Sequence, residues 1–242
     1  MVEEDEILYR EFRHGQVAYG FKWNVSNHRR LGHETGDLAS LYAHLETIHR
    51  NIVPEKPFVD PLYTRASRLK LSMRSRKEKT YLRRKLEKSK SITTCPTDDI
   101  VEKVREYHRA RNDTTYQADH AILKEFIKND PATIAIEVPV WSDSYRLTGH
   151  VDVIRFVDGH IQVCDYKPGS LETVTRRFID ALPQVAAYGE MVTLHLSHTL
   201  RSALEAPLLP EVKCCIFDTH ASWHFDAKLF VQLSVMGAIS DI

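Results

Sequence analysis

Two aspartates and a lysine that could together bind a metal ion lie between Arg146 and Gly169. The stretch reads RLTGHVDVIRFVDGHIQVCDYKPG and contains Asp152, Asp165 and Lys167. Two carboxylates can hold a hard divalent cation such as Mg²⁺, and an amine beside them can orient a water or offset negative charge. This chemistry requires that the chain bring the three side chains together.

The Asp-Gly pair at 158–159 predicts a tight hairpin, because a type I′ turn needs positive φ at both central residues. With a two-residue loop, Asp152 lies directly across from Asp165, and His150 lies across from Lys167. Opposed side chains share one face of the sheet, so the two carboxylates would repel each other unless a cation lies between them. The alternative is a solvated polar end of a hairpin, in which water separates the carboxylates.

Three motifs, in order along the chain, resemble the PD-(D/E)XK nuclease superfamily. They are Gly149-His150-Val151-Asp152, then Cys164-Asp165-Tyr166-Lys167-Pro168-Gly169, then Gln184-Val185-Ala186-Ala187-Tyr188. The likeness is closest to the branch with RecB-type nuclease domains and CRISPR-associated adaptation nucleases, and it covers roughly residues 113–228. It implies a restriction-endonuclease-like α/β core in residues 113–242, with a mixed central sheet flanked by helices. Residues 1–112 would form a mostly helical N-terminal extension.

The resemblance implies a metal centre with Mg²⁺ or Mn²⁺. Its ligands would be Asp152, Asp165, the backbone carbonyl of Tyr166 and His120, with Glu137 as a possible accessory acid. From pattern alone, His120 on an apolar helix face is more typical of a packed core histidine, and the resemblance is what favours a metal ligand. Glu137 is equally typical of a solvent-facing strand residue.

The same resemblance implies catalytic roles for three further side chains. Lys167 would orient or help deprotonate the attacking water, while Gln184 would bind a phosphate or that water with support from Tyr188. Pro183 suits the first turn of a helix, which places Gln184 and Tyr188 one turn apart on a shared face. The alternative for Gln184 is an ordinary position on a helix surface.

Hydrophobic periodicity predicts the elements that position these residues. Strands are expected over residues 7–23, 133–141, 211–218 and 222–226, and helices over 37–49, 97–111 and 113–128. Thr97, followed by acidic residues, is the expected N-cap of the second of these helices.

Composition indicates a globular protein, with 43% hydrophobic residues, 27% charged residues and no net charge. No apolar run approaches the ~18 residues of a membrane span, and the acidic start MVEEDE is unlike a secretory signal. The four cysteines have no disulfide-framework spacing, so we expect a cytoplasmic protein without membrane contact.

The cysteines also bear on an iron–sulfur cluster, which some relatives bind through one cysteine before the core and three after it. Here Cys95 precedes the core, Cys164 lies within it, and only Cys214 and Cys215 follow. Adjacent strand residues point to opposite faces, so Cys214 and Cys215 could hardly bind one cluster. The sequence predicts none.

Positive charge is concentrated in residues 65–90, which hold twelve lysines and arginines against two glutamates. Such a block is typical of a phosphate-facing patch, and the alternative is a solvated basic linker. Leucines at partly helical spacing favour a basic helix near the active cleft. The expected nucleic-acid-binding residues are Arg74, Arg76, Lys77, Arg83, Arg84, Arg176 and Arg177.

Together these features predict a metal-dependent nuclease that hydrolyses single- or double-stranded DNA during repair, recombination or processing. One alternative is a catalytically inactive nucleic-acid-binding or scaffold protein on a nuclease-like fold. Another is a metal-dependent hydrolase with a different substrate, which the basic segment disfavours.

Overall fold

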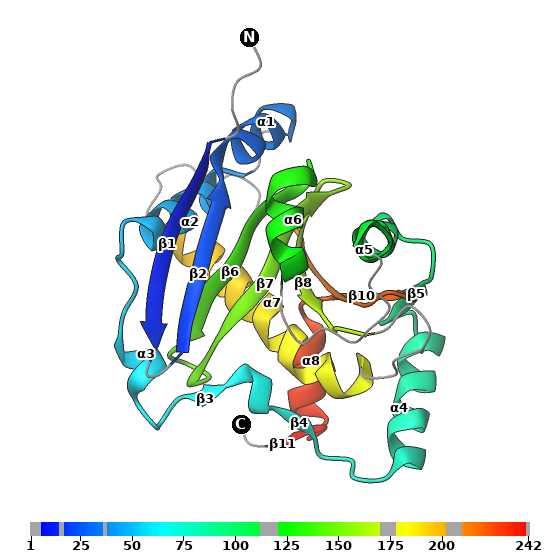
Figure 1. Cartoon of the computed structure of the whole chain (residues 1–242). Coiled ribbons are helices and arrows are strands. Elements are labelled where there is room, and N and C mark those ends of the chain that lie inside the picture. Colours follow the sequence, from blue (N-terminus) through cyan, green and yellow to red (C-terminus); the bar gives the residue numbers. More distant parts are fainter. Residues whose placement is uncertain are drawn as a thin grey trace.

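A computed structural model describes residues 6–14, 17–35, 38–111, 121–169, 178–201 and 210–240. Its centre is a twisted mixed sheet with helices on both faces (Figure 1). Within the described residues the sheet has nine strands, eight of them in the order β1-β2-β6-β7-β8-β9-β10-β5 and the short β3 paired with β7. The mixed α/β architecture predicted from the sequence is confirmed.

The strands of this sheet vary from two to eleven residues. They are β1 (Ile7–His14), β2 (Val17–Asn24), β3 (Thr64–Arg65), β5 (Thr93–Cys95), β6 (Thr133–Ser142), β7 (Leu147–Val157), β8 (His160–Tyr166), β9 (Val212–Phe217) and β10 (Ser222–Asp226). All neighbours are antiparallel except β8 with β9 and β3 with β7. A separate two-stranded sheet joins β4 (Lys70–Leu71) to β11 (Ile239–Ser240).

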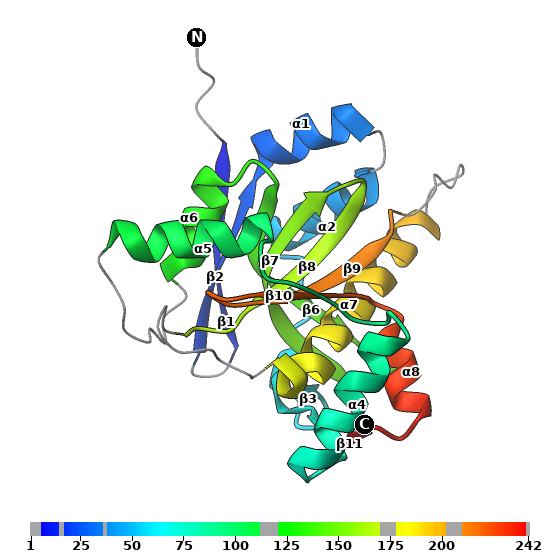
Figure 2. The ribbon, with the colours of Figure 1, turned by 90° about the vertical axis from the view of Figure 1, so that its right-hand side faces the viewer.

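The helices cover the two faces of the sheet, and a separate apolar core lies between the helices and the sheet on each face. They are α1 (Val25–Thr35), α2 (Ala39–His49), α3 (Lys56–Val59), α4 (Arg76–Lys88), α5 (Asp99–Ala110), α6 (Ala121–Asn129), α7 (Phe178–Arg201) and α8 (Leu229–Val235). The larger core lies under α2, α7 and α8, and the smaller one lies under α5 and α6 (Figure 2).

The hairpin of β7 and β8 has the predicted turn, and its register is as predicted from Val157–His160 to Val153–Cys164. The predicted pairs Asp152–Asp165 and His150–Lys167 lie beyond the end of this ladder and stay predictions. Asp158 and Gly159 have φ of 49° and 77°, as a type I′ turn requires. Val157 pairs with His160, and the antiparallel ladder continues to Val153 opposite Cys164. The hairpin therefore carries the aspartates to the end of the ladder away from the turn.

The first part of the chain contributes strands to the main sheet. β1 and β2 form a hairpin, and β2 pairs with β6 through Lys22 opposite Ile136 and Trp23 opposite Ala135. Strand character was predicted over residues 7–23. The pairing of β2 with β6 was not predicted. The division of the chain at residue 112 stays a prediction.

Two predicted helix starts are wrong. The long helix begins at Phe178, so Pro183 lies inside α7 and not in its first turn. The N-cap of α5 is Asp98 in place of Thr97, and its side chain makes no capping hydrogen bond. That carboxylate instead accepts from Ser222 and contacts His224 on β10.

Candidate active site

The carboxylate of Asp152 lies where the backbone ladder between β7 and β8 ends. Beyond the Val153–Cys164 pair, the amide of Tyr166 donates to Oδ2 of Asp152 at 2.9 Å. The side chain thus takes the place of a backbone acceptor and keeps Asp152 close to residues 165 and 166. Both aspartates are nearly buried, with 6% of Asp152 and 1% of Asp165 exposed.

Four side chains, from β8, from Lys167 directly after it and from α7, form a continuous polar network beside Asp152. Gln184 Nε2 donates to Asp165 Oδ1 at 3.0 Å and to the Tyr188 hydroxyl at 3.1 Å. Lys167 Nζ donates to Gln184 Oε1 at 3.2 Å and forms an ion pair with Asp165 Oδ2. The predicted catalytic residues therefore meet at one place.

The hydroxyl of Tyr188 lies close enough to both aspartates to be affected by their charges. Burial, and then the charges of Asp165 and Asp152, raise the pKa of its hydroxyl above the ordinary value. A phenol in this setting stays protonated. The ring also explains Gly149, because a Cβ there would lie 2.4 Å from Tyr188 Cε1. The glycine of the Gly-x-x-Asp motif leaves the space that Tyr188 fills.

Glu137 stands opposite Asp152 on the neighbouring strand, since Ile136 pairs with Val153 and Val138 with Val151. Its φ is 52°, in the left-handed region that side chains other than glycine rarely adopt. Such a backbone conformation costs of order 1–3 kcal/mol and is concentrated at functional sites. Its register places Glu137 beside Asp152, and its accessory role stays a prediction.

A cleft of about 770 Å³ opens in front of these acids and is lined by Asp152, Glu137, His150 and Tyr188. Much of its wall comes from the β1–β2 hairpin, including Tyr9, Tyr19 and Lys22. The ring of Tyr19 stacks on His150 with 3.4 Å between ring centroids, which fixes the hairpin against β7.

The cleft also gathers positive charge opposite the carboxylates. Lys22, Arg65 and Lys124 line it, and Arg65 donates to the Tyr19 hydroxyl at 3.3 Å. Burial and the charges of Lys124 and Lys128 lower the pKa of Lys22. Cations that repel one another in a cleft are stabilised by an anion such as a phosphate. The contribution of the β1–β2 hairpin to the cleft was not predicted from the sequence. The feature that pointed to these strands was the alternating pattern before residue 24.

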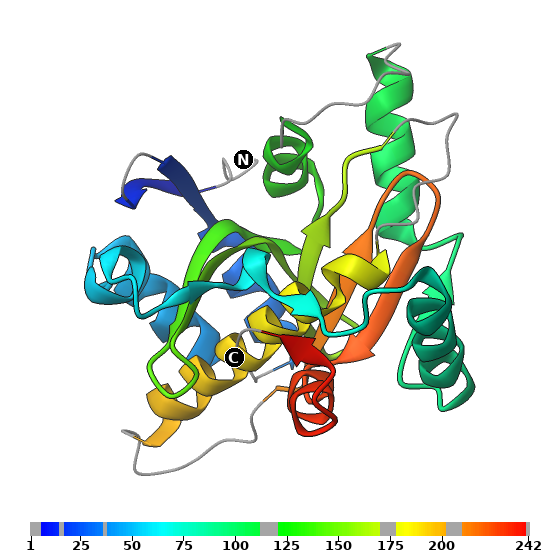
Figure 3. The ribbon, with the colours of Figure 1, turned by 90° about the horizontal axis from the view of Figure 1, so that it is seen from below.

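The other predicted nucleic-acid contacts lie elsewhere. The expected basic helix exists as α4, placed beyond the β5 edge of the sheet (Figure 3). Arg74, Arg76, Arg83 and Arg84 line a second cavity, of about 800 Å³, that also contains Trp223. Among the described residues that line the cleft of Asp152, none belongs to α4. Lys77 lies on α4 as well, while His120, Arg176 and Arg177 fall outside the described residues.

The two aspartates fit a hard divalent cation. Asp152 and Asp165 are nearly buried carboxylates, and the amine of Lys167 is paired with Asp165 alone of the two. Carboxylate and backbone carbonyl oxygens are the ligands that Mg²⁺ and Mn²⁺ take. The arrangement can therefore bind such an ion beside a lysine and a hydrogen-bonding amide.

The cysteines of β9 point to opposite faces, as predicted. Cys214 lies in the larger core and Cys215 in the smaller one. Among the described helices, none is long and apolar enough to cross a bilayer.

Comparison with protein families gives a match. A family model described as the PD-(D/E)XK nuclease superfamily matches residues 27–209, which is about three quarters of the chain. No curated protein matches the chain significantly. The matched region contains β6, β7, β8 and α7, whereas the β1–β2 hairpin precedes it.

Proposed function

Because the chain belongs to the PD-(D/E)XK nuclease superfamily, we propose that it is a deoxyribonuclease dependent on Mg²⁺ or Mn²⁺. The superfamily implies a nuclease that acts on nucleic acid, and its members generally use divalent metals. The observation that carries the proposal is the network of Asp165, Lys167, Gln184 and Tyr188 beside Asp152. A decayed nuclease used only as a scaffold would be expected to have lost one of these partners.

The carboxylates of Asp152 and Asp165 would hold the ion, with the Tyr166 carbonyl and, from the resemblance, His120. The chemistry that such an ion supplies when bound is polarisation of the scissile phosphate and a lower pKa for a bound water. Glu137, opposite Asp152 in the register, would add a further acid to this set.

Lys167 would orient the attacking water and offset negative charge that develops on the phosphate. Gln184 fixes the lysine, because its Oε1 accepts from Lys167 while its Nε2 donates to Asp165 and Tyr188. The amide thereby sets the distance between the amine and the carboxylate. Tyr188 stays uncharged, and its hydroxyl accepts from the amide nitrogen of Gln184, whose oxygen accepts from Lys167.

The lining of the cleft favours one strand of nucleic acid, or a frayed end, over an intact duplex. Lys22 and Lys124 suit phosphates, and the rings of Tyr9 and Tyr19 suit stacking with bases. Arg76, Arg83 and Arg84 on α4 would contact the chain of phosphates further from the reacting bond.

A cleavage assay on the full chain tests this function. Linear and circular DNA, each single- and double-stranded, would be incubated with Mg²⁺, Mn²⁺ or a chelator. We expect metal-dependent cleavage that requires Asp152, Asp165 and Lys167, so that Asp152→Asn, Asp165→Asn and Lys167→Ala abolish it without unfolding the protein.

The matched control is Lys213→Ala, since Lys213 lies on β9 and its ion pair within the described part of the chain is with the exposed Glu211. This variant should cleave like the wild type. Cleavage that persists in Lys167→Ala, or that proceeds equally well with a chelator, would contradict the proposed mechanism. A requirement for free ends is tested by the comparison of linear with circular DNA.

A further inference from the structure

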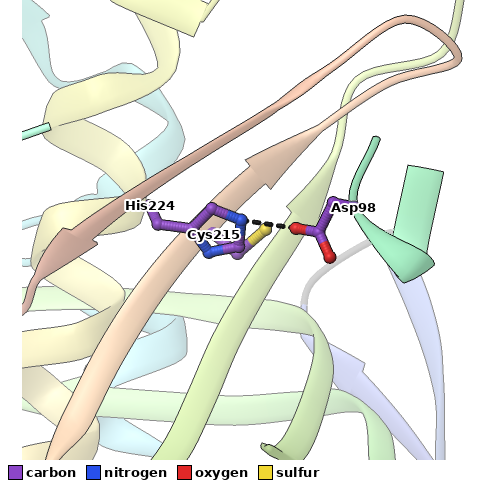
Figure 4. A group of neighbouring side chains, drawn as sticks. All are labelled: Asp98, Cys215 and His224. Atoms are coloured by element: carbon purple, nitrogen blue, oxygen red, sulfur yellow. Dashed lines mark hydrogen bonds and ion pairs between the residues drawn. The ribbon is translucent and has the colours of Figure 1, made fainter. Parts of the chain in front are cut away.

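Three potential metal ligands from distant parts of the chain converge outside the cleft of Asp152. Asp98 precedes α5, Cys215 lies on β9 and His224 on β10, and their ligand atoms all lie within 4.8 Å of one another (Figure 4). The side chain of Cys215 is fully buried, while those of Asp98 and His224 are 16% and 25% exposed. The cluster is thus enclosed by protein and open on one side.

Three atoms of Asp98, Ser222 and His224 contact one another in a triangle, in which His224 uses one ring nitrogen. His224 Nε2 lies 2.5 Å from Asp98 Oδ2 and 2.8 Å from the hydroxyl of Ser222, which itself lies 2.7 Å from Asp98 Oδ2. A catalytic Ser–His–Asp triad uses both ring nitrogens, so this arrangement is not one. A nitrogen, an oxygen and a sulfur atom within 4.8 Å of one another are instead the donor set of a transition-metal site.

We propose that Asp98, Cys215 and His224 form a structural Zn²⁺ site, with the fourth position taken by the Ser222 hydroxyl or a water. Thiolate and imidazole select Zn²⁺ over Mg²⁺, which prefers oxygen ligands only. Cys215 is fully buried, and a coordinated cation supplies the charge that a buried thiolate needs. The site would be separate from the proposed active site, whose described ligands offer only oxygen.

The position of the cluster gives the ion a structural role. It would join the start of α5, beside the β5 edge, to strands β9 and β10, which come more than a hundred residues later in the chain. Cross-links between distant segments restrict the unfolded chain most, and metal binding contributes directly to folding free energy. Loss of the ion should therefore lower stability and leave the cleft residues in place.

Gln162 determines the protonation of the site without an ion. Its Nε2 lies 3.3 Å from His224 Nδ1, and its Oε1 accepts from Arg155 at 3.2 Å. The ring proton is then on Nε2, where Asp98 accepts it. An ion at Nε2 requires the single ring proton to move to Nδ1, so Gln162 must turn its carbonyl towards the ring, and the proton released on binding comes from the Cys215 thiol. Binding should release a proton and should tighten in Gln162→Glu, whose carboxylate accepts from both Arg155 and Nδ1.

The test is titration of the metal-free full chain with Co²⁺, followed by displacement with Zn²⁺. A thiolate ligand gives a near-ultraviolet charge-transfer band, and Co²⁺ bound only by oxygens at Asp152 and Asp165 gives none. We expect the band in the wild type and its loss in Cys215→Ser, with Zn²⁺ affinity reduced at least about tenfold to a hundredfold.

Cys214→Ser is the matched control, because Cys214 is the adjacent and equally buried thiol on the opposite face of β9. It should keep the band and the Zn²⁺ affinity, and so should separate loss of a ligand from the cost of changing a buried cysteine. Absence of the band in the folded wild type would overturn the proposal, as would equal effects of the two substitutions. Weaker binding in Gln162→Glu would count against coordination through Nε2.

Discussion

Replacing Gly149 with alanine tests whether the aromatic ring of Tyr188 sets the geometry of the active site. The added Cβ would lie 2.4 Å from Tyr188 Cε1 and 3.1 Å from both Cζ and the hydroxyl oxygen, so the ring has to move. Tyr188 is only 3% exposed, and its hydroxyl is tied to Gln184. Overpacking of this kind costs about 1–3 kcal/mol. For a chain of this size that is a fall in Tm of about 2–4 °C per kcal/mol.

A double-mutant cycle isolates this contact. Thermal unfolding and cleavage would be measured for Gly149→Ala, Tyr188→Ala and the pair, and we expect the Gly149→Ala penalty to vanish once the ring is gone, with a coupling of about 1–3 kcal/mol. Gly32→Ala on α1 is the control, since its nearest neighbour is Leu38 Cβ at 3.8 Å. A Gly149→Ala protein as stable and active as Gly32→Ala would refute the reasoning.

Three further predictions concern single side chains. Gln184→Leu removes hydrogen bonds to two charged partners. Loss of the equivalent of one such bond from the transition state, about 1.5–3 kcal/mol, should lower kcat/KM by roughly 10- to 150-fold in steady-state cleavage assays. Gln232→Leu on the exposed face of α8 should leave kcat/KM unchanged. Glu137→Gly relieves the backbone strain of a φ of 52°. Chemical denaturation should therefore show a free energy of unfolding equal to or about 1 kcal/mol above that of the wild type, while cleavage falls. A clear loss of stability would show that the Glu137 side chain has a structural role. Burial lowers the pKa of His28 to about 4, so its contribution to stability is complete above pH 6.5 and is lost as pH falls towards 4, by up to about 3 kcal/mol. Urea unfolding of His28→Gln should show a smaller loss of unfolding free energy over that pH range. An unchanged dependence of stability on pH would exclude His28 as the cause.

The residues of the β7–β8 hairpin were predictable because its turn and register are local properties. An Asp-Gly loop requires positive φ at both positions, and the period of two then decides which side chains share a face. The same holds for Gln184 and Tyr188, whose spacing of four residues places them together on any helix. Such patterns keep their meaning wherever the element lies in the fold, which is why the motifs of the superfamily can be read from the chain.

Local pattern could not show which distant segments complete the site. The β1–β2 hairpin reads as two strands, but only the pairing of β2 with β6, more than a hundred residues later, places Tyr19 and Lys22 in the cleft. The left-handed φ of Glu137 likewise depends on how β6 pairs with β7, and the meeting of Asp98 with His224 depends on the pairing of β5 with β10. The sequence by itself determined the local chemistry of the hairpin and the helix. The tertiary structure decided the walls of the cleft and the second cluster, because contacts between remote segments depend on the packing of the whole sheet.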